Sequence, residues 1–147
     1  MNLAWTVRVG LARDGSARVR TRMHGLAIGQ PLDFGASSPS ASALEALLGA
    51  LGADVLLRFR DLCERRRLPI DQAEVRVDGQ LGNALVALGV VGEEGDPALA
   101  QASVTLSVAS PAEQNQLENV WQEVLARSPL VATLRKSASL SLELQML

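Results

Sequence analysis

The sequence predicts an α+β domain built around one long apolar helix. Three observations predict this fold class. Apolar and polar residues alternate near both ends of the chain, which is the two-residue period of β-strands. From residue 43 to residue 66 the apolar residues recur every three or four positions, which is the period of a helix. A second, amphipathic helical pattern precedes the last strand. With 147 residues, we expect a single domain spanning 1–147.

The first thirty residues predict a β-hairpin followed by a short third strand. Residues 5–11 alternate between apolar and polar side chains, and residues 19–23 repeat that alternation. Between them, an Asp-Gly pair at positions 14 and 15 favours a tight turn, because both residue types tolerate positive φ. A third strand is expected near residues 26–28. Proline, glycine and serine in residues 29–42 then predict a loop that leads into a helix.

The helical pattern runs from Ala43 to Arg66, and Pro69 is expected to stop it. Its first part, from Leu44 to Leu57, is apolar on nearly every side, which predicts burial all round. In a chain this short, such burial suggests that a second subunit supplies part of the cover.

The second half of the chain predicts three strands and a helix before the final strand. Apolar and polar residues alternate over 73–79, 83–91 and 102–108, which predicts three strands, with a turn at 92–97. A helix should begin at Ser110, with Ser110 as N-cap and a glutamate three residues on as its capping-box partner. The helix presents one apolar stripe and should end near Ser128, where a Ser-Pro pair favours a helix exit. The clearest strand pattern of the chain follows, formed by alternating residues 139–146.

Composition excludes several classes of function. The net charge of −2 and four aromatic side chains argue against a nucleic-acid partner. One histidine, His24, and one cysteine, Cys63, leave no metal-ligand set, and we expect no cofactor. No apolar run approaches the ~20 residues of a membrane span, and the N-terminus has no targeting pattern. The default expectation is therefore a cytoplasmic protein without a membrane partner.

Asp54 is the most informative residue of the long helix. It is surrounded in sequence by leucine and valine, where an unpaired charge would cost several kcal/mol. Asp54 must therefore be paired with a cation, be protonated, or face a pocket or a solvent-accessible dimer seam. The sequence offers three N-terminal arginines as partners: Arg13, Arg20 and Arg22.

Two motifs resemble the OsmC/Ohr family of organic hydroperoxide reductases. The first is Ser38–Asp54, in which the family's Pro-x-Glu-Leu-Leu-x-x-Ala-Leu-Gly-x-Cys run is matched by these residues: Glu45, Leu47, Leu48, Ala50, Leu51 and Gly52. The second is Ala126–Leu130, which is similar to the segment where a Cys-Pro pair follows the family's amphipathic helix. The resemblance implies antiparallel sheets wrapped around a central buried helix, and an intertwined homodimer with active sites at the subunit interface.

The residues at the family's active-site positions differ from its pattern. Asp54 stands at the position of the first, peroxide-reducing cysteine, and Ser128 at that of the second, resolving cysteine. Neither a carboxylate nor a hydroxyl can form the sulfenic acid and disulfide that the family reaction needs. Arg13 sits where some members place an active-site arginine on a loop, although a hairpin turn alone would look the same. Glu45 matches the family's glutamate and equally suits a helix N-terminus.

Three functional interpretations remain open. The first is a member that has lost thiol peroxidase activity and keeps a structural role or binds a small hydrophobic or anionic ligand at the interface pocket. The second is an organic hydroperoxide reductase, a peroxide-stress protein, still active through Cys63. That thiol lies nine residues beyond Asp54, on roughly the opposite side of the helix at ~100° per residue. The preferred interpretation of Cys63 is a small buried hydrophobe. The third is a non-redox enzyme built on Asp54 and an arginine.

Overall fold

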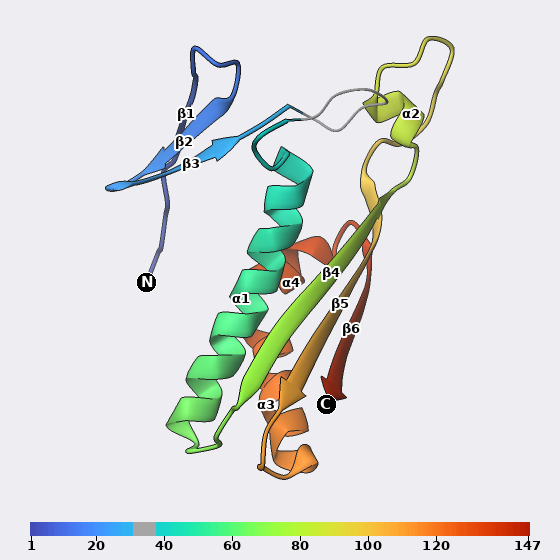
Figure 1. The fold of residues 1–147 in the computed structure, drawn as a ribbon. Coiled ribbons are helices and arrows are strands. Elements are labelled where there is room, and N and C mark those ends of the chain that lie inside the picture. Colours follow the sequence, from blue (N-terminus) through green and yellow to red (C-terminus); the bar gives the residue numbers. More distant parts are fainter. Residues whose placement is uncertain (31–37) are drawn as a thin grey trace. The chain divides into compact units, whose positions relative to one another are not determined.

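The structure is a computed structural model that describes residues 1–30 and 38–147. Its strands and helices follow the predicted order except at two places, where a short helix replaces the strand predicted over residues 83–91 and another precedes the last strand (Figure 1). The chain divides into two compact units, Met1–Leu47 and Leu48–Leu147. Residues 31–37 of the predicted loop lie outside the described residues. No helix in the described parts is long and apolar enough to cross a membrane.

The first unit contains a three-stranded antiparallel sheet in the order β1-β2-β3. Its strands are β1 (Arg8–Leu11), β2 (Ala17–Thr21) and β3 (His24–Ile28). The predicted Asp-Gly hairpin is confirmed, with Gly15 at φ +84°, a conformation that glycine adopts without strain. The second strand ends before the predicted residue 23, because Arg22 takes a positive φ of 52° and turns the chain into β3.

Helix α1 (Ala43–Arg65) lies within one residue of its predicted bounds. At its start, the Ser42 and Glu45 side chains each accept a hydrogen bond from the other residue's backbone N–H, which is a capping box. It ends before Pro69, in a left-handed residue: Arg67 has φ +57°, and the N–H groups of Arg67 and Leu68 donate to the carbonyls of Glu64 and Cys63. This pattern is a Schellman motif in which arginine occupies the position usually held by glycine.

Among the described residues, the buried side chains of α1 lie on one face. The buried residues recur at helical spacing along that face: Leu51, Gly52, Val55, Phe59 and Cys63. On another face Leu57 remains 48% exposed. The prediction of burial on every side included cover by a second subunit, and this part stays a prediction.

The second unit contains a three-stranded sheet in the order β4-β5-β6. The strands are β4 (Gln72–Leu81), β5 (Leu99–Ala109) and β6 (Ser139–Met146). β4 and β5 are antiparallel, but β6 runs parallel to β5, so the expectation of purely antiparallel sheets is wrong here. The reason is the connection: a helical crossover returns the chain to the end from which β5 started, which produces a parallel neighbour.

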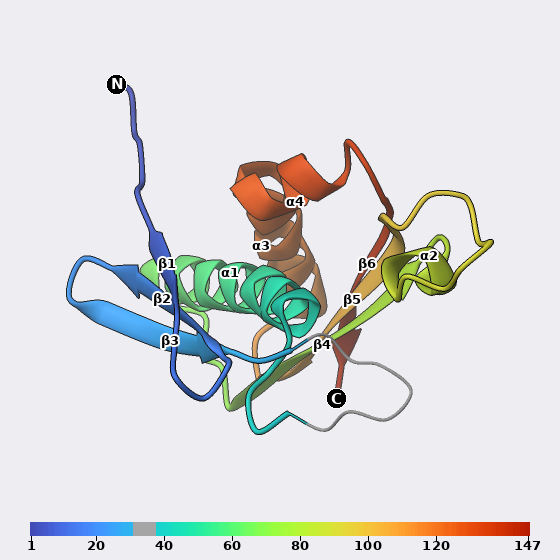
Figure 2. The same ribbon diagram turned by 90° about the horizontal axis from the view of Figure 1, so that it is seen from above.

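Helices α1 and α3 (Gln114–Arg127) lie on one face of the β4-β5-β6 sheet (Figure 2). Inward-pointing residues of β5, such as Val104 and Leu106, are fully buried against them. The apolar stripe predicted for the amphipathic helix is confirmed in α3, since all five of its members are buried: Leu117, Val120, Trp121, Val124 and Leu125. Phe59 and Trp121 meet edge to face, with ring centroids 6.5 Å apart, and this contact joins α1 to α3.

The strand predicted over residues 83–91 is wrong. This segment contains the short helix α2 (Ala84–Ala87). The Asn83 side chain accepts hydrogen bonds from the N–H groups of Leu85 and Val86, at 3.0 and 3.4 Å, and so caps the helix. A side-chain cap of this kind favours a helical turn over an extended chain.

The predicted start of the amphipathic helix is also wrong. Helix α3 (Gln114–Arg127) begins after Glu113, which makes no side-chain capping bond. Ser110 instead donates to the Pro69 carbonyl and accepts from the Ala112 N–H, so its hydroxyl is used in the turn before the helix. After Ser128 the chain does not leave helical structure, but forms a further helix, α4 (Pro129–Leu134).

Candidate functional site

The candidate site lies where α1 passes the junction of α3 and α4. Asp54 is on α1, and Ser128 is the single residue between α3 and α4. Ser128 has an extended backbone, with φ −73° and ψ 117°, and acts as both the C-cap of α3 and the N-cap of α4. The chain turn at this junction directs its hydroxyl toward α1. The structure therefore brings together the two positions that the resemblance gives to the family's cysteines.

The Ser128 hydroxyl both donates and accepts a hydrogen bond. Its Oγ donates to Asp54 Oδ2 at 2.5 Å and accepts from the Val131 N–H at 3.1 Å. Its residue is only 1% exposed. A short hydrogen bond to an ionised acceptor is stronger than one between neutral groups. This bond joins α1 to α4 across 74 residues of sequence.

Asp54 is ion-paired, which is one of the alternatives that the sequence left open. Arg58 Nε donates to Asp54 Oδ1 at 2.9 Å, so each carboxylate oxygen has a protein donor. The arginine was not among those named from the sequence, although the i,i+4 spacing of an acidic and a basic residue was a signal for it. The Asp54 side chain is 19% exposed and that of Arg58 39%, so the pair lies at the edge of the core. Arg13, Arg20 and Arg22 lie in the first unit.

The functional groups of this site contain oxygen and nitrogen but no sulfur. It contains a carboxylate, a hydroxyl and a guanidinium, none of which cycles between thiol and disulfide. The unit 48–147 contains no histidine, so no imidazole of this unit activates Ser128 as a nucleophile. Both oxygens of Asp54 already accept protein hydrogen bonds. The arrangement is suited to holding helices together and to presenting Arg58 at the surface.

Cys63 lies in the hydrophobic core and is 0% exposed. Burial raises the pKa of its thiol from 9.0 to about 11, against a smaller opposing effect of Arg66. A reactive cysteine needs an accessible thiolate at neutral pH. The interpretation of Cys63 as a small buried hydrophobe is therefore confirmed, and its neighbouring arginines do not activate it.

Glu45 and Arg13 are placed outside this hydrogen-bond network. The backbone N–H of Ser42 holds the pKa of the Glu45 carboxyl below its ordinary value, with a further contribution from the Ser42 side chain. This is the helix N-terminal role that the sequence left open for Glu45. Arg13 is exposed in the β1–β2 turn, where neighbouring Asp14 accepts hydrogen bonds from the backbone and hydroxyl of Ser16.

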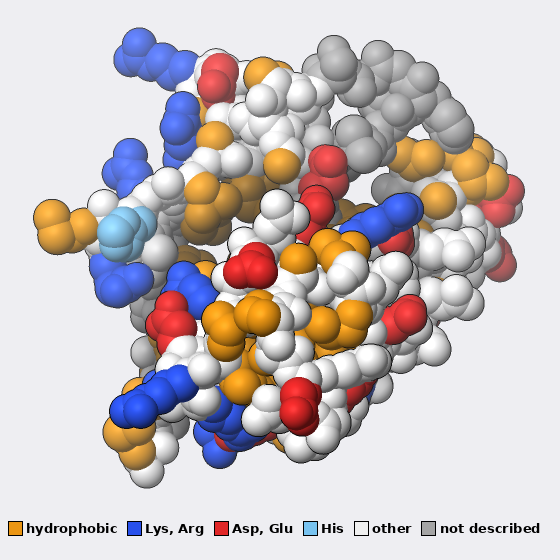
Figure 3. All heavy atoms as spheres, turned by 60° about the horizontal axis from the view of Figure 1, so that its bottom comes forward, with side chains coloured by type: hydrophobic (Ala, Val, Ile, Leu, Met, Phe, Trp, Pro, Cys, Tyr) orange, Lys and Arg blue, Asp and Glu red, His pale blue; other side chains and the backbone are white. Residues whose placement is uncertain are grey.

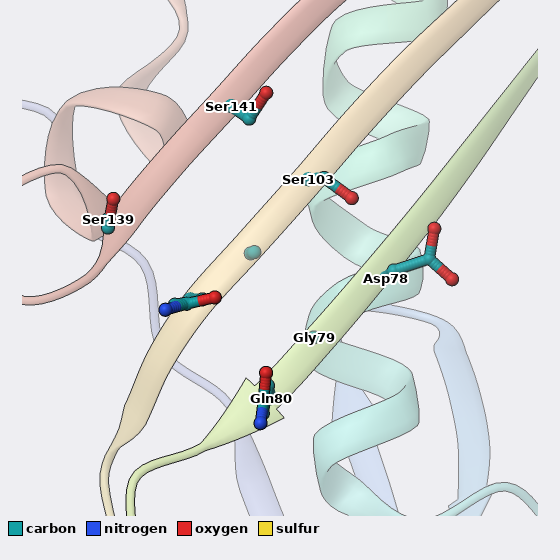
Figure 4. Close-up of a pocket in the computed structure, with 8 residues that line it drawn as sticks. Asp78, Gly79, Gln80, Ser103, Ser139 and Ser141 are labelled. Carbon is teal, nitrogen blue, oxygen red and sulfur yellow. The ribbon is translucent and has the colours of Figure 1, made fainter.

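Two hollows of the second unit are candidate binding places. The first, of about 110 Å³, lies between α1 and α3 beside the Asp54–Arg58 pair, and these residues line it: Arg58, Asp61, Leu62, Arg65, Val124 and Arg127. The second, of about 290 Å³, lies on the polar outer face of the sheet, where Asp78, Ser103 and Ser141 point away from the helices (Figure 4). Among the described residues, no three His, Cys, Asp or Glu side chains are grouped to hold a metal ion.

Comparison with known proteins places the chain in a family. The model of the OsmC-like protein family matches residues 35–143. None of the curated proteins matches the sequence. Over its whole length the fold is similar to the crystal structure of an OsmC-like protein from Mycoplasma pneumoniae, with a TM-score of 0.80, 16% identity, and 100% and 99% of the two chains covered.

Two further similar structures carry names from peroxide resistance. An organic hydroperoxide resistance protein OsmC from Legionella pneumophila gives a TM-score of 0.69 at 11% identity, covering 97% of each chain. The organic hydroperoxide resistance protein OhrB of Bacillus subtilis gives 0.63 at 14% identity, covering 97% of this chain and 98% of its own. At these identities the structures show a shared fold. The chain belongs to the OsmC-like family, and the expected fold class is confirmed.

Proposed function

We propose that this OsmC-like protein has lost thiol peroxidase chemistry and keeps a structural and small-ligand-binding role at the Asp54 site. The observation that carries the proposal is the hydrogen bond from Ser128 Oγ to Asp54 Oδ2 at 2.5 Å. It joins the two positions that the family resemblance assigns to the reacting cysteines. Where a thiol pair would close and open a disulfide, this chain has a hydrogen bond between Ser128 and Asp54 that holds α1 against the α3–α4 junction.

The burial and the raised pKa of Cys63, the one cysteine of the sequence, support the proposal. Peroxide reduction begins when a thiolate sulfur attacks the peroxide oxygen, releasing an alcohol and leaving a sulfenic acid on sulfur. Cys63 is buried and its pKa is about 11, so neither access nor ionisation favours that attack. A second thiol to resolve the sulfenic acid is missing, since the chain has one cysteine. These features disfavour the alternative of a peroxidase active through Cys63.

The proposal includes a homodimer formed through exposed apolar surface of α1. Apolar side chains reach the surface between charged ones on the face shown in Figure 3. Leu57 of α1 is 48% exposed, and an apolar groove of about 480 Å³ runs beside it, between α1 and the start of β4. A second copy of the chain would remove this apolar surface from water. Sedimentation equilibrium should give the mass of two chains, and a monomer at micromolar concentration contradicts this part of the proposal.

The test of lost chemistry is the oxidation state of Cys63 after exposure to cumene hydroperoxide. Because Cys63 is the only thiol, an intact mass spectrum with dimedone present reports its sulfenic acid without ambiguity. We expect the native protein to remain unmodified while a urea-unfolded sample is labelled. Stoichiometric dimedone labelling of the folded protein would contradict the proposal and favour the peroxidase alternative.

A further inference from the structure

The cleft between α1 and α3 is lined by one stripe of each helix. Arg58, Asp61 and Arg65 follow one another on α1 at spacings of three and four, so their side chains share a face. Val124 and Arg127 lie three residues apart on α3 and form the opposite wall. Three guanidinium groups and one carboxylate therefore meet around a space of about 110 Å³, beside the Asp54–Ser128 link.

The acidic groups near the cleft are already engaged by other partners. Asp61 accepts from Arg60, and Glu123 forms ion pairs with both Arg66 and Arg127. Within the fully described unit 48–147, Arg65 forms no ion pair.

Arg58 keeps part of its guanidinium available. It donates only its Nε to Asp54, so its terminal Nη groups keep their donors within that unit. The cleft thus has an excess of cationic donors.

We propose that this cleft binds the phosphate group of a phosphate monoester. Guanidinium groups bind phosphate oxygens through paired, charge-assisted hydrogen bonds. When the ion-pair partners are counted with the lining residues, five arginines stand against three carboxylates. A phosphate dianion balances this excess of two positive charges, and a single carboxylate does not. Sites for whole drug-sized ligands measure roughly 300–1,000 Å³. The cleft therefore admits the charged group, while the rest of the ligand extends over the surface.

The inference rests on the proposed function, because it names the ligand class for the site that Asp54 and Arg58 share. Arg58 belongs to both, because it lines the cleft and donates its Nε to Asp54. The bond to Asp54 holds the guanidinium in place before a ligand binds. A donor that is held in place before binding loses less conformational entropy when the ligand arrives.

The test is calorimetric titration of the whole protein with phenyl phosphate, with inorganic phosphate and benzoate as comparison ligands. Arg65→Gln removes a lining arginine that forms no ion pair within residues 48–147, and Arg135→Gln removes the same charge from an exposed position at the end of α4. We expect saturable one-site binding of phenyl phosphate, at least tenfold weaker in Arg65→Gln and unchanged in Arg135→Gln. Inorganic phosphate should compete, and benzoate should bind at least tenfold more weakly.

Three outcomes overturn the inference: no saturable binding of phenyl phosphate, equal weakening in both variants, or benzoate binding as well as phenyl phosphate. Any of them leaves the loss of peroxidase chemistry standing, because that is measured on Cys63. Conversely, dimedone labelling of folded Cys63 refutes the proposed function whatever the phosphate titration shows. The two failures are therefore distinguishable.

Discussion

Replacing Ser128 with alanine removes both hydrogen bonds of a buried hydroxyl. Oγ donates to the Asp54 carboxylate and accepts from the Val131 N–H at the start of α4. A hydrogen bond to a charged group contributes about 1.5–3 kcal/mol, and an N-cap serine about 1 kcal/mol. Asp54 is 19% exposed, so water partly replaces the lost donor. We therefore expect Ser128→Ala to lower the free energy of unfolding by about 2–3 kcal/mol.

The partner substitution, Asp54→Asn, keeps the shape of the side chain and an amide oxygen that accepts one bond. It removes the charge, and with it the Arg58 ion pair, which is partly exposed and contributes no more than about 0.5 kcal/mol. We expect Asp54→Asn to cost about 1–2 kcal/mol. Because the two residues share one bond, the double variant should lose about 1 kcal/mol less than the sum of the single losses.

Urea unfolding followed by tryptophan fluorescence measures these differences. Trp121 is buried and 1% exposed, whereas Trp5 is exposed, so the series is made in a Trp5→Phe background. Ser141→Ala, on the exposed face of β6, is the control and should change stability by less than about 0.5 kcal/mol. A loss from Ser128→Ala no larger than that of the control, or strictly additive losses in the double variant, would refute the role assigned to the link.

Three further predictions concern groups outside that link. Glu45→Gln should lower the melting temperature at neutral pH, because the carboxylate stabilises the protein only when it is ionised. The difference in melting temperature between the two proteins should vanish as pH falls through the lowered pKa of Glu45. A difference that does not depend on pH contradicts this prediction. Iodoacetamide should alkylate folded Cys63 at pH 8 at least about a hundredfold more slowly than the unfolded chain, since raising the pKa from 9.0 to about 11 removes most of the thiolate; equal rates contradict it. Asn83→Ala should cost about 1 kcal/mol through loss of the α2 cap, with amide exchange accelerated at Leu85 and Val86; unchanged exchange contradicts it.

Hydrophobic period predicted most of the fold because the core is built from long, regular stripes. The buried faces of α1, α3 and β5 are continuous, and each imposes its period on the sequence. The hairpin was equally predictable, because Gly15 supplies the positive φ that its turn needs. These elements need only local pattern and burial to be recognised.

Other features depend on interactions that the pattern does not encode. Residues 83–91 alternate like a strand, yet the side chain of Asn83 caps a helical turn there. Ser110 has the right neighbours for a helix cap, but the Pro69 carbonyl, distant in sequence, takes its hydroxyl. The direction of β6 follows from the crossover through α3 and α4, since alternation is the same in parallel and antiparallel strands.

The candidate site was predicted in part. The sequence left several alternatives open for Asp54, and the structure shows an ion pair with Arg58, four residues further along the same helix, which was not among the arginines named. The bond to Ser128 joins residues far apart in the chain, and the resemblance to a family with two reacting positions gave the only sequence signal for it. The cleft lined by Arg65 and Arg127 was not predicted, because it depends on how α1 and α3 pack.

The loss of thiol peroxidase chemistry is tested most directly by turnover. Consumption of cumene hydroperoxide by the purified protein is measured with dithiothreitol as the reductant, beside a Cys63→Ser variant. The account predicts no consumption above the rate of the reductant alone, and no difference between the two proteins. Catalytic consumption that Cys63→Ser abolishes would contradict it and would identify Cys63 as the nucleophile of a working peroxidase.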